Sequence, residues 1–264
     1  MRNLMLITLI LFPVLMHSCN IGQAKTDIPS SIISEKEPNP DSLETIEYYA
    51  NNSKVTKPSH VIGTVSKGKL NHGKLFPFYG DNFSYFDSRS YLNHRAFTSD
   101  AVLSTILASY QDMKSIADKR HFYLMELSNK EGGQIYPHRT HQNGLSADFM
   151  MPMLKDNAPY IGLDTLGIDH YWLKFNNKGE YSEDKSVKVD FELIAKHILN
   201  LEKNARKNGL KISKVIIKIE FKDELFSSAA GQRLKNSGIY VVQNLSKLIN
   251  DIHDDHYHID FKKV

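Results

Sequence analysis

The sequence contains little of the chemistry on which many small exported proteins and cofactor sites depend. Its 264 residues include a single cysteine, which excludes a disulfide framework, a four-cysteine zinc site and an iron–sulfur cluster. An excess of charge is also lacking, because 33 Lys and Arg residues against 30 Asp and Glu residues give a formal net charge of +3. The basic residues are dispersed along the chain. Nucleic acid is therefore not an expected partner.

Long apolar runs are missing after the first residues. A mean hydropathy of −0.39 excludes a polytopic membrane protein. The one apolar run, residues 4–16, follows Arg2 and precedes Ser18 and Cys19. About a dozen apolar residues are too few to span a bilayer comfortably, but they match the core of a signal peptide.

We interpret residues 1–19 as a bacterial lipoprotein signal peptide, in which Cys19 would be lipidated and become the mature N-terminus. A plain secretory signal with an incidental cysteine is the alternative. Both interpretations place the mature protein outside the cytoplasm, and the first predicts a periplasmic protein anchored to a membrane through Cys19. Residues 20–57 are polar without a sustained apolar period and predict a flexible linker, with one or two helical turns at 43–50.

Residues 58–264 have the pattern of one globular domain. Ser99 is a suitable N-cap for an amphipathic helix that extends to about residue 117. A second helix is expected at 189–207, closed by Gly209. Strands are expected at 121–128, 145–151, 214–221 and 256–261, and short helices at 223–228 and 241–251. Because these elements lack a regular βαβ rhythm, they predict an α+β fold with a small, largely antiparallel sheet and flanking helices.

Histidines carry the most distinctive chemistry. Five of the twelve lie in two short windows: His138 and His141 in the first, and His253, His256 and His258 in the second. Residues i and i+2 of a strand point to the same side, so His256 and His258 can face one site. Gly144 permits a sharp turn that can bring His141 and Asp148 to one point. Two imidazoles and a carboxylate are a common catalytic zinc set, beside which a further imidazole can act as a base.

Other catalytic motifs are missing from the sequence. It contains no G-x4-G-K-[ST] phosphate loop, no G-x-S-x-G nucleophile elbow and no H-E-x-x-H helix. No nucleophile is left for covalent catalysis. The aromatic side chains of Tyr171, Trp172 and Phe175 are expected to pack in the core rather than to contact a ligand.

The two histidine windows resemble a known family. The pattern H-x6-D followed by a late H-x-H is similar to that of the lysostaphin-type, D-Ala-D-Ala metallopeptidase group, and most of all to the penicillin-insensitive murein endopeptidases. The stretch HRTHQNGLSADF resembles the HxSHQxGLDxD signature of that family, and HDDHYHIDF resembles its final HxxHxHVRL block. VIGTVSKGKLNHGKLFPF and YLNHRAFTSDAVLSTI resemble its N-terminal segments. The resemblance covers about residues 60–264 and is loose at 152–210.

The resemblance implies roles for individual residues. His141, Asp148 and His258 would bind a catalytic zinc ion on the sheet. His256 would be the general base, and His253 is a second candidate for that role.

The same resemblance concerns further residues. His138 would lie beside the site, where a second metal has been associated with the family, or would be merely structural. Asp169 and His170 are candidate partners of a second metal by residue type only. Two departures from the signatures stand out, with Ser146 in place of an aspartate and Asp260 in place of an arginine. Since neither is a primary ligand, these departures bring the orientation of the ligands and the contacts to substrate anions into question.

The expected function is that of a zinc-dependent endopeptidase that cleaves peptide cross-links in peptidoglycan. One alternative is a D,D-carboxypeptidase or dipeptidase that trims stem peptides at the same site. Another is a non-catalytic peptidoglycan-binding lipoprotein. No feature of the sequence indicates an oligomeric state.

Overall fold

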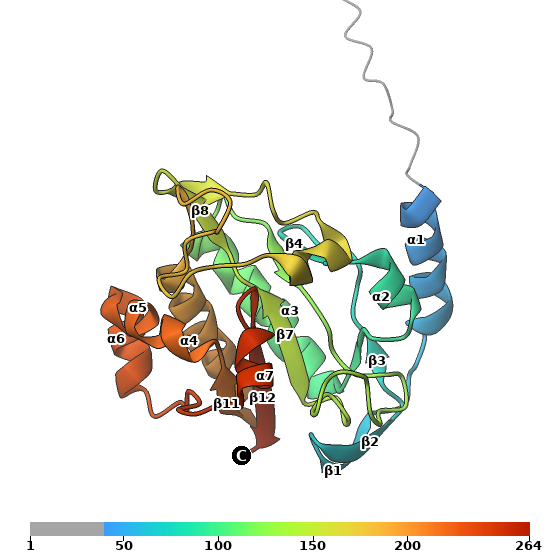
Figure 1. Ribbon diagram of the computed structural model, residues 1–264. Helices are drawn as coiled ribbons and strands as arrows, with labels where there is room; N and C mark the ends of the chain where they lie inside the picture. The colour runs from blue at the N-terminus through green and yellow to red at the C-terminus, as the bar shows by residue number, and fades with distance from the viewer. Residues whose placement is uncertain (1–39) are drawn as a thin grey trace, which may run out of the picture. The chain divides into compact units, whose positions relative to one another are not determined.

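A computed structural model describes residues 40–264 of the chain (Figure 1). The expected signal peptide at 1–19, and residues 20–39 of the expected linker, lie outside the described residues. Within residues 40–264, no helix combines the length and the apolar character needed to cross a membrane.

A five-stranded sheet forms the centre of the fold. Its strand order is β11 (Leu210–Ile216), β12 (His256–Lys263), β7 (Ser146–Met150), β6 (Phe122–Leu124) and β4 (Phe83–Tyr85). Every pair is antiparallel except β4 with β6, which is parallel. β12, which contains the C-terminal H-x-H segment, therefore lies between β11 and β7. The predicted α+β fold with a small, largely antiparallel sheet is confirmed.

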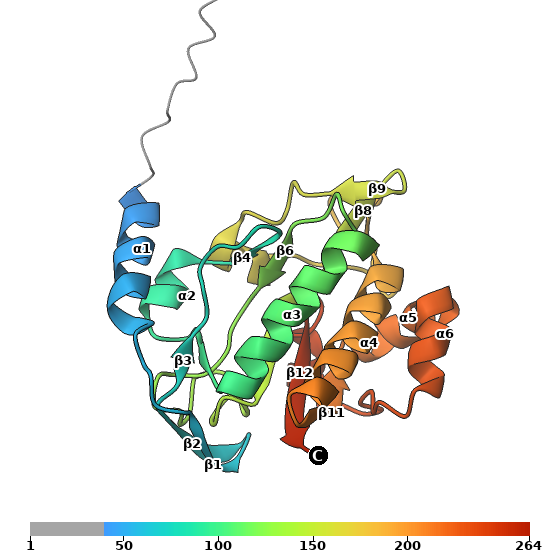
Figure 2. The ribbon, with the colours of Figure 1, turned by 180° about the vertical axis from the view of Figure 1, so that it is seen from behind.

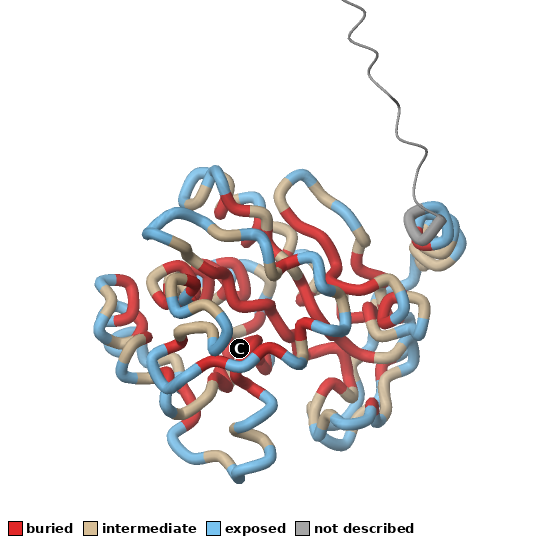
Figure 3. Tube along the Cα trace, turned by 45° about the horizontal axis from the view of Figure 1, so that its top comes forward, coloured by how far each residue is buried: buried red, intermediate tan, exposed pale blue. Residues whose placement is uncertain are grey.

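Two long helices cover one face of this sheet, as Figure 2 shows: α3 (Asp100–Ile116) and α4 (Phe191–Lys207). Ser99 caps α3 by accepting a hydrogen bond from the Val102 amide at 3.3 Å, as its sequence predicts. Past the end of α4, Gly209 has a φ of +71°, a conformation that glycine adopts without strain. Buried stretches run through the interior strands and the inner sides of the helices (Figure 3). The opposite face of the sheet is left to carry polar side chains.

Smaller elements surround the central sheet. Three small sheets are formed by β1 (His60–Thr64) with β2 (Lys67–Asn71), by β3 (Lys74–Leu75) with β5 (Phe97–Thr98), and by β8 (Met153–Lys155) with β9 (Ala158–Tyr160) and β10 (Val187–Val189). Short helices are α2 (Ser88–Leu92), η1 (Gly167–Trp172), η2 (Ile219–Phe221), α5 (Lys222–Ser227), α6 (Ala229–Asn236) and α7 (Lys247–Asp251).

A helix lies inside the range expected as a linker. α1 (Pro40–Asn52) is longer than the one or two turns expected at 43–50, and it packs against α2. The Tyr48 hydroxyl lies 2.6 Å from Nδ1 of His94, and the Tyr48 ring meets the Tyr91 ring edge-on at 5.5 Å. These side-chain contacts hold α1 against the rest of the fold.

Several expected boundaries were wrong. The strand expected at 214–221 is β11, which ends at Ile216, because β12 gives it no partner beyond His258, and η2 follows. β11 also contains a bulge between Ile212 and Lys214. The strand expected at 121–128 shortens to β6, and the helix expected at 241–251 shortens to α7. The helix expected at 223–228 is present as α5, and α6 follows it as a further helix.

Candidate metal centre

The centre of the site is a cross-strand pair. Asp148 of β7 and His258 of β12 are directly opposite each other in the antiparallel ladder, and Nδ1 of His258 lies 2.7 Å from Oδ1 of Asp148. Because side chains alternate between the faces of a strand, His256 and Asp260 stand on the same face as His258. Both members of the pair are buried, so their charges act in a medium of low dielectric constant.

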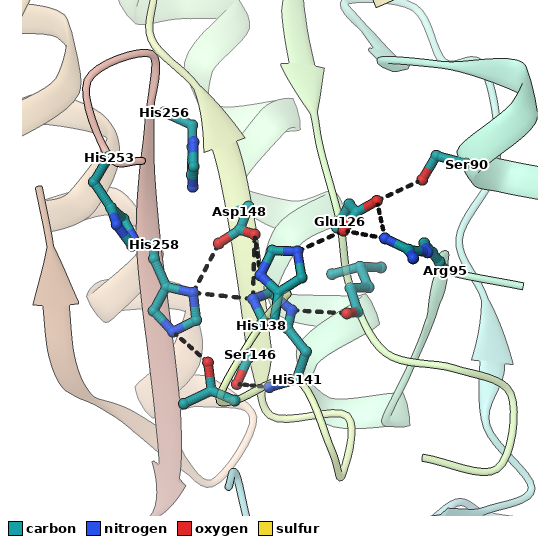
Figure 4. A network of polar contacts seen from close by, with 12 residues as sticks. Ser90, Arg95, Glu126, His138, His141, Ser146, Asp148, His253, His256 and His258 are labelled. Atoms are coloured by element: carbon teal, nitrogen blue, oxygen red, sulfur yellow. Dashed lines mark hydrogen bonds and ion pairs between the residues drawn. The ribbon is translucent and has the colours of Figure 1, made fainter. Parts of the chain in front are cut away.

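The loop before β7 brings His141 to this pair (Figure 4). His141 and Gly144 have φ angles of +65° and +76°, and a Cβ on Gly144 would come within 2.9 Å of a Leu70 methyl and the Ser99 amide. Glycine at this turn is therefore required by both strain and space. Nδ1–H of His141 donates to the Leu127 carbonyl at 2.7 Å, which leaves Nε2 as the acceptor nitrogen.

That nitrogen faces the pair directly. Nε2 of His141 lies 3.0 Å from Nδ1 of His258 and 3.2 Å from Oδ2 of Asp148. Burial alone would raise the pKa of the Asp148 carboxyl, but the neighbouring His141 and His258 rings hold it well below its usual value. Asp148 is therefore a carboxylate, as a metal ligand must be.

His138 completes the cluster from the side. Its Nδ1 lies 3.6 Å from Oδ2 of Asp148, and its Nε2 lies 2.6 Å from Oε2 of Glu126. Glu126 is buried and accepts two hydrogen bonds from Arg95, at 2.9 and 3.0 Å, and one from Ser90 at 3.0 Å. Burial would raise the pKa of Glu126, but His138 and Arg95 lower it. An anionic Glu126 thus orients the His138 ring (Figure 4).

The donor set fits a divalent transition metal. His138, His141 and Asp148 each offer one ligand atom, and these atoms all lie within 4.8 Å of one another. Nδ1 of His258 is in contact with two of the three residues. Oδ2 of Asp148 is buried and accepts no hydrogen bond from the described residues. Its lone pairs are therefore available to a metal ion in the cluster. Imidazole nitrogens with one carboxylate form the usual ligand set of catalytic zinc.

His256 lies on the same strand face, beside the cluster. Its Nδ1 is 2.6 Å from Oδ1 of Asp255. Burial opposes protonation of His256, but the Asp255 carboxylate outweighs this effect and raises the pKa of the ring above its usual value. The Tyr171 ring meets the His256 ring edge-on at 6.0 Å.

His253 stands next to His256, with 4.8 Å between the ring centroids. Its Nδ1–H donates to the Ile249 carbonyl at 2.5 Å. Burial, together with the nearby His256 and His258 rings, puts the pKa of His253 well below its usual value. His253 is therefore a neutral ring with its Nδ1 already engaged.

The structure does not bring Asp169 and His170 into the cluster of the described residues that can hold a metal. Asp169 is exposed. His170 is buried, with its ring nitrogens 3.1 Å from the Leu163 carbonyl and 3.2 Å from the Asp255 carbonyl. Trp172 was expected to pack in the core, but 76% of its surface is exposed, so that expectation was wrong.

Sequence reasoning missed Glu126, Arg95 and Asp255. Glu126 is the single acidic residue in the apolar stretch HFYLMELS, and a buried charge in a strand needs a partner, so this residue carried a usable signal. No local pattern in the sequence indicates the role of Arg95, because its contact with Glu126 spans 31 positions. Asp255 directly precedes His256.

Comparison with known proteins agrees with this geometry. The family model of the penicillin-insensitive murein endopeptidases matches residues 61–262. A comparison with curated proteins finds no match. The matched range contains both histidine windows and the central sheet apart from Lys263, the last residue of β12. The chain therefore belongs to the penicillin-insensitive murein endopeptidase family.

Proposed function

We propose that this protein is a zinc-dependent endopeptidase that cleaves peptide cross-links in peptidoglycan. Family membership supports a murein endopeptidase role. The observation that carries the zinc proposal is the buried cluster of imidazole nitrogens around the Asp148 carboxylate. His141, Asp148 and His258 would hold the ion, with His138 beside them. When bound, zinc would polarise the scissile carbonyl and acidify a water molecule.

His256 is the residue best suited to move the proton. Asp255 accepts a hydrogen bond from Nδ1–H of His256 at 2.6 Å, which leaves the lone pair of Nε2 free to take a proton. The raised pKa of His256 brings its basicity closer to the range that general-base catalysis needs at neutral pH. His256 accepts a proton from the attacking water and then passes it to the leaving amine.

His253 is less suited to that role. Its Nδ1–H is committed to the Ile249 carbonyl, and its lowered pKa makes it a weaker base than His256. A neutral ring beside His256 keeps a second positive charge away from the site. We therefore assign the base to His256 and a supporting role to His253.

The decisive experiment is digestion of purified sacculi with the mature protein, with and without a chelator. Cross-linked dimeric muropeptides should become monomers while the glycan strands stay intact, and the chelator should stop the reaction. Release of terminal D-alanine alone would favour the carboxypeptidase alternative. Binding to sacculi without any product would favour the non-catalytic alternative.

We also propose that the protein is a periplasmic lipoprotein held to a membrane through Cys19. Ser18 and Cys19 directly after the apolar run at 4–16 support this proposal. Cys19→Ala should abolish labelling with palmitate and partitioning into detergent. If the variant partitioned as the natural protein does, the anchor would have to lie elsewhere.

A further inference from the structure

Three residues on three neighbouring strands stand in register beside the cluster. Lys214 of β11 is opposite Asp260 of β12, which is opposite Ser146 of β7. Their side chains meet: Nζ of Lys214 lies 3.0 Å from Oδ2 of Asp260, and the Ser146 hydroxyl donates to Oδ1 of Asp260 at 2.6 Å. Asp260 and Ser146 are the two departures from the family signatures that stand out in the sequence.

Asp260 also holds the outer nitrogen of His258. Nε2 of His258 lies 2.7 Å from Oδ1 of Asp260. Because an ionised carboxylate only accepts hydrogen bonds, the hydrogen must be on Nε2. The inner nitrogen, Nδ1, lies 2.7 Å from the Asp148 carboxylate and 3.0 Å from Nε2 of His141. By the same argument Nδ1 also carries a hydrogen while no metal is bound, and a metal ion at this position would replace that hydrogen. Because Asp260 holds the hydrogen on Nε2, Nδ1 is the nitrogen that remains for the metal.

Lys214 and Ser146 stabilise the buried carboxylate of Asp260. Asp260 is only 1% exposed, and a buried anion is costly unless it is paired and hydrogen-bonded. Lys214 provides the opposite charge and Ser146 a hydroxyl donor. The Ser146 oxygen in turn accepts a hydrogen bond from the His141 amide at 3.2 Å, so the same group connects two of the candidate ligands.

We infer that Asp260 is a positioning residue that, together with Lys214 and Ser146, fixes the ring of His258 in the orientation and tautomer that a metal requires. Positions 260 and 146 are direct cross-strand partners, so a carboxylate at 260 on β12 can hold Nε2 of His258 in place of a carboxylate at 146 on β7. The departure at Asp260 thus compensates for the departure at Ser146. This inference rests on the proposed role of His258 as a zinc ligand.

Zinc affinity, measured by competition with a chromophoric chelator, tests the inference. Asp260→Ser should weaken zinc binding by about 10–100-fold, the usual effect of losing a partner of a metal ligand. Adding Ser146→Asp to Asp260→Ser moves the carboxylate across the ladder and should restore most of that affinity. The visible spectrum of the Co²⁺-loaded protein should change in Asp260→Ser and return in the double variant.

Asp112→Asn is the matched control, since Asp112 also accepts hydrogen bonds from a lysine and two amides, but on α3. It should leave zinc affinity unchanged. Natural zinc affinity in Asp260→Ser, or no recovery in the double variant, would overturn the inference. If Asp260→Ser does not fold, the double variant decides: affinity within a few-fold of natural supports the inference, and a 10–100-fold deficit overturns it. Natural protein that binds zinc but cleaves no muropeptide refutes only the proposed function.

Discussion

His197 should make the stability of the domain depend on pH in a predictable way. This residue of α4 is 1% exposed and lies among aromatic rings, with Tyr110 stacked on it at 5.5 Å and Phe149 edge-on at 5.0 Å. Its Nδ1 shares a hydrogen bond with the Tyr257 hydroxyl at 2.5 Å. Tyr257 lies between His256 and His258, so His197 supports the strand that carries both.

The size of the effect follows from the pKa of the ring. Burial lowers the pKa of His197 to about 3, whereas a histidine in an unfolded chain has a pKa of about 6.5. Between these values the unfolded state binds a proton that the folded state does not, so the stability from His197 is complete above about pH 6.5 and is lost as the pH falls. At about 1.4 kcal/mol per pH unit, the loss between pH 7 and pH 5 is about 2 kcal/mol.

Urea unfolding of the natural protein and of His197→Phe at both pH values measures this loss. The phenyl ring keeps the aromatic packing and removes the titration, and the contributions of the other histidines cancel in the comparison. The free energy of unfolding should fall by about 2 kcal/mol more in the natural protein than in His197→Phe. Equal losses in the two proteins would refute the reasoning, because they would show that His197 does not resist protonation in the fold.

Three further predictions concern the site and its scaffold. His256→Ala should keep its zinc and lose about 10²–10⁴-fold in activity, whereas His258→Ala should lose both; elemental analysis beside muropeptide cleavage decides, and the opposite pattern would exchange the two roles. Asp255→Asn should lower the pKa of His256 and move the acid limb of the pH–rate profile to lower pH, and an unmoved limb would exclude this pairing. Ser99→Ala should lower the free energy of unfolding by about 1 kcal/mol, measured in urea at pH 7, where an unchanged midpoint would contradict the role of the cap.

The site was predictable where it depends on strand periodicity. His256 and His258 share a face because side chains alternate along β12, and Asp148 lies in a segment whose apolar character already indicated a strand. The structure brings together His141, Asp148 and His258, with His138 beside them. Their assignment as zinc ligands stays a prediction.

Other parts depend on contacts that no local pattern encodes. The strand expected at 214–221 ends early because its length is set by the pairing of β12, and this pairing is distant in sequence. The three-stranded sheet of β8, β9 and β10 was not predicted, because three-residue strands are too short to show a period. The carboxylate of Asp260 was read as a departure, since only the ladder reveals that Ser146 is its partner.

The bulge in β11 determines which single residue this strand can lose without disturbing its pairing with β12. Ile212 is opposite Phe261 and Lys214 is opposite Asp260, so Ser213 is the surplus residue of the ladder. A chain shortened by Ser213 would restore an unbroken ladder, and Lys214 would still face Asp260. Removal of Val215 instead would shift Ile216 by one place and turn it to the other side of the sheet. Two single deletions, two positions apart, should thus differ sharply in what they do to the fold.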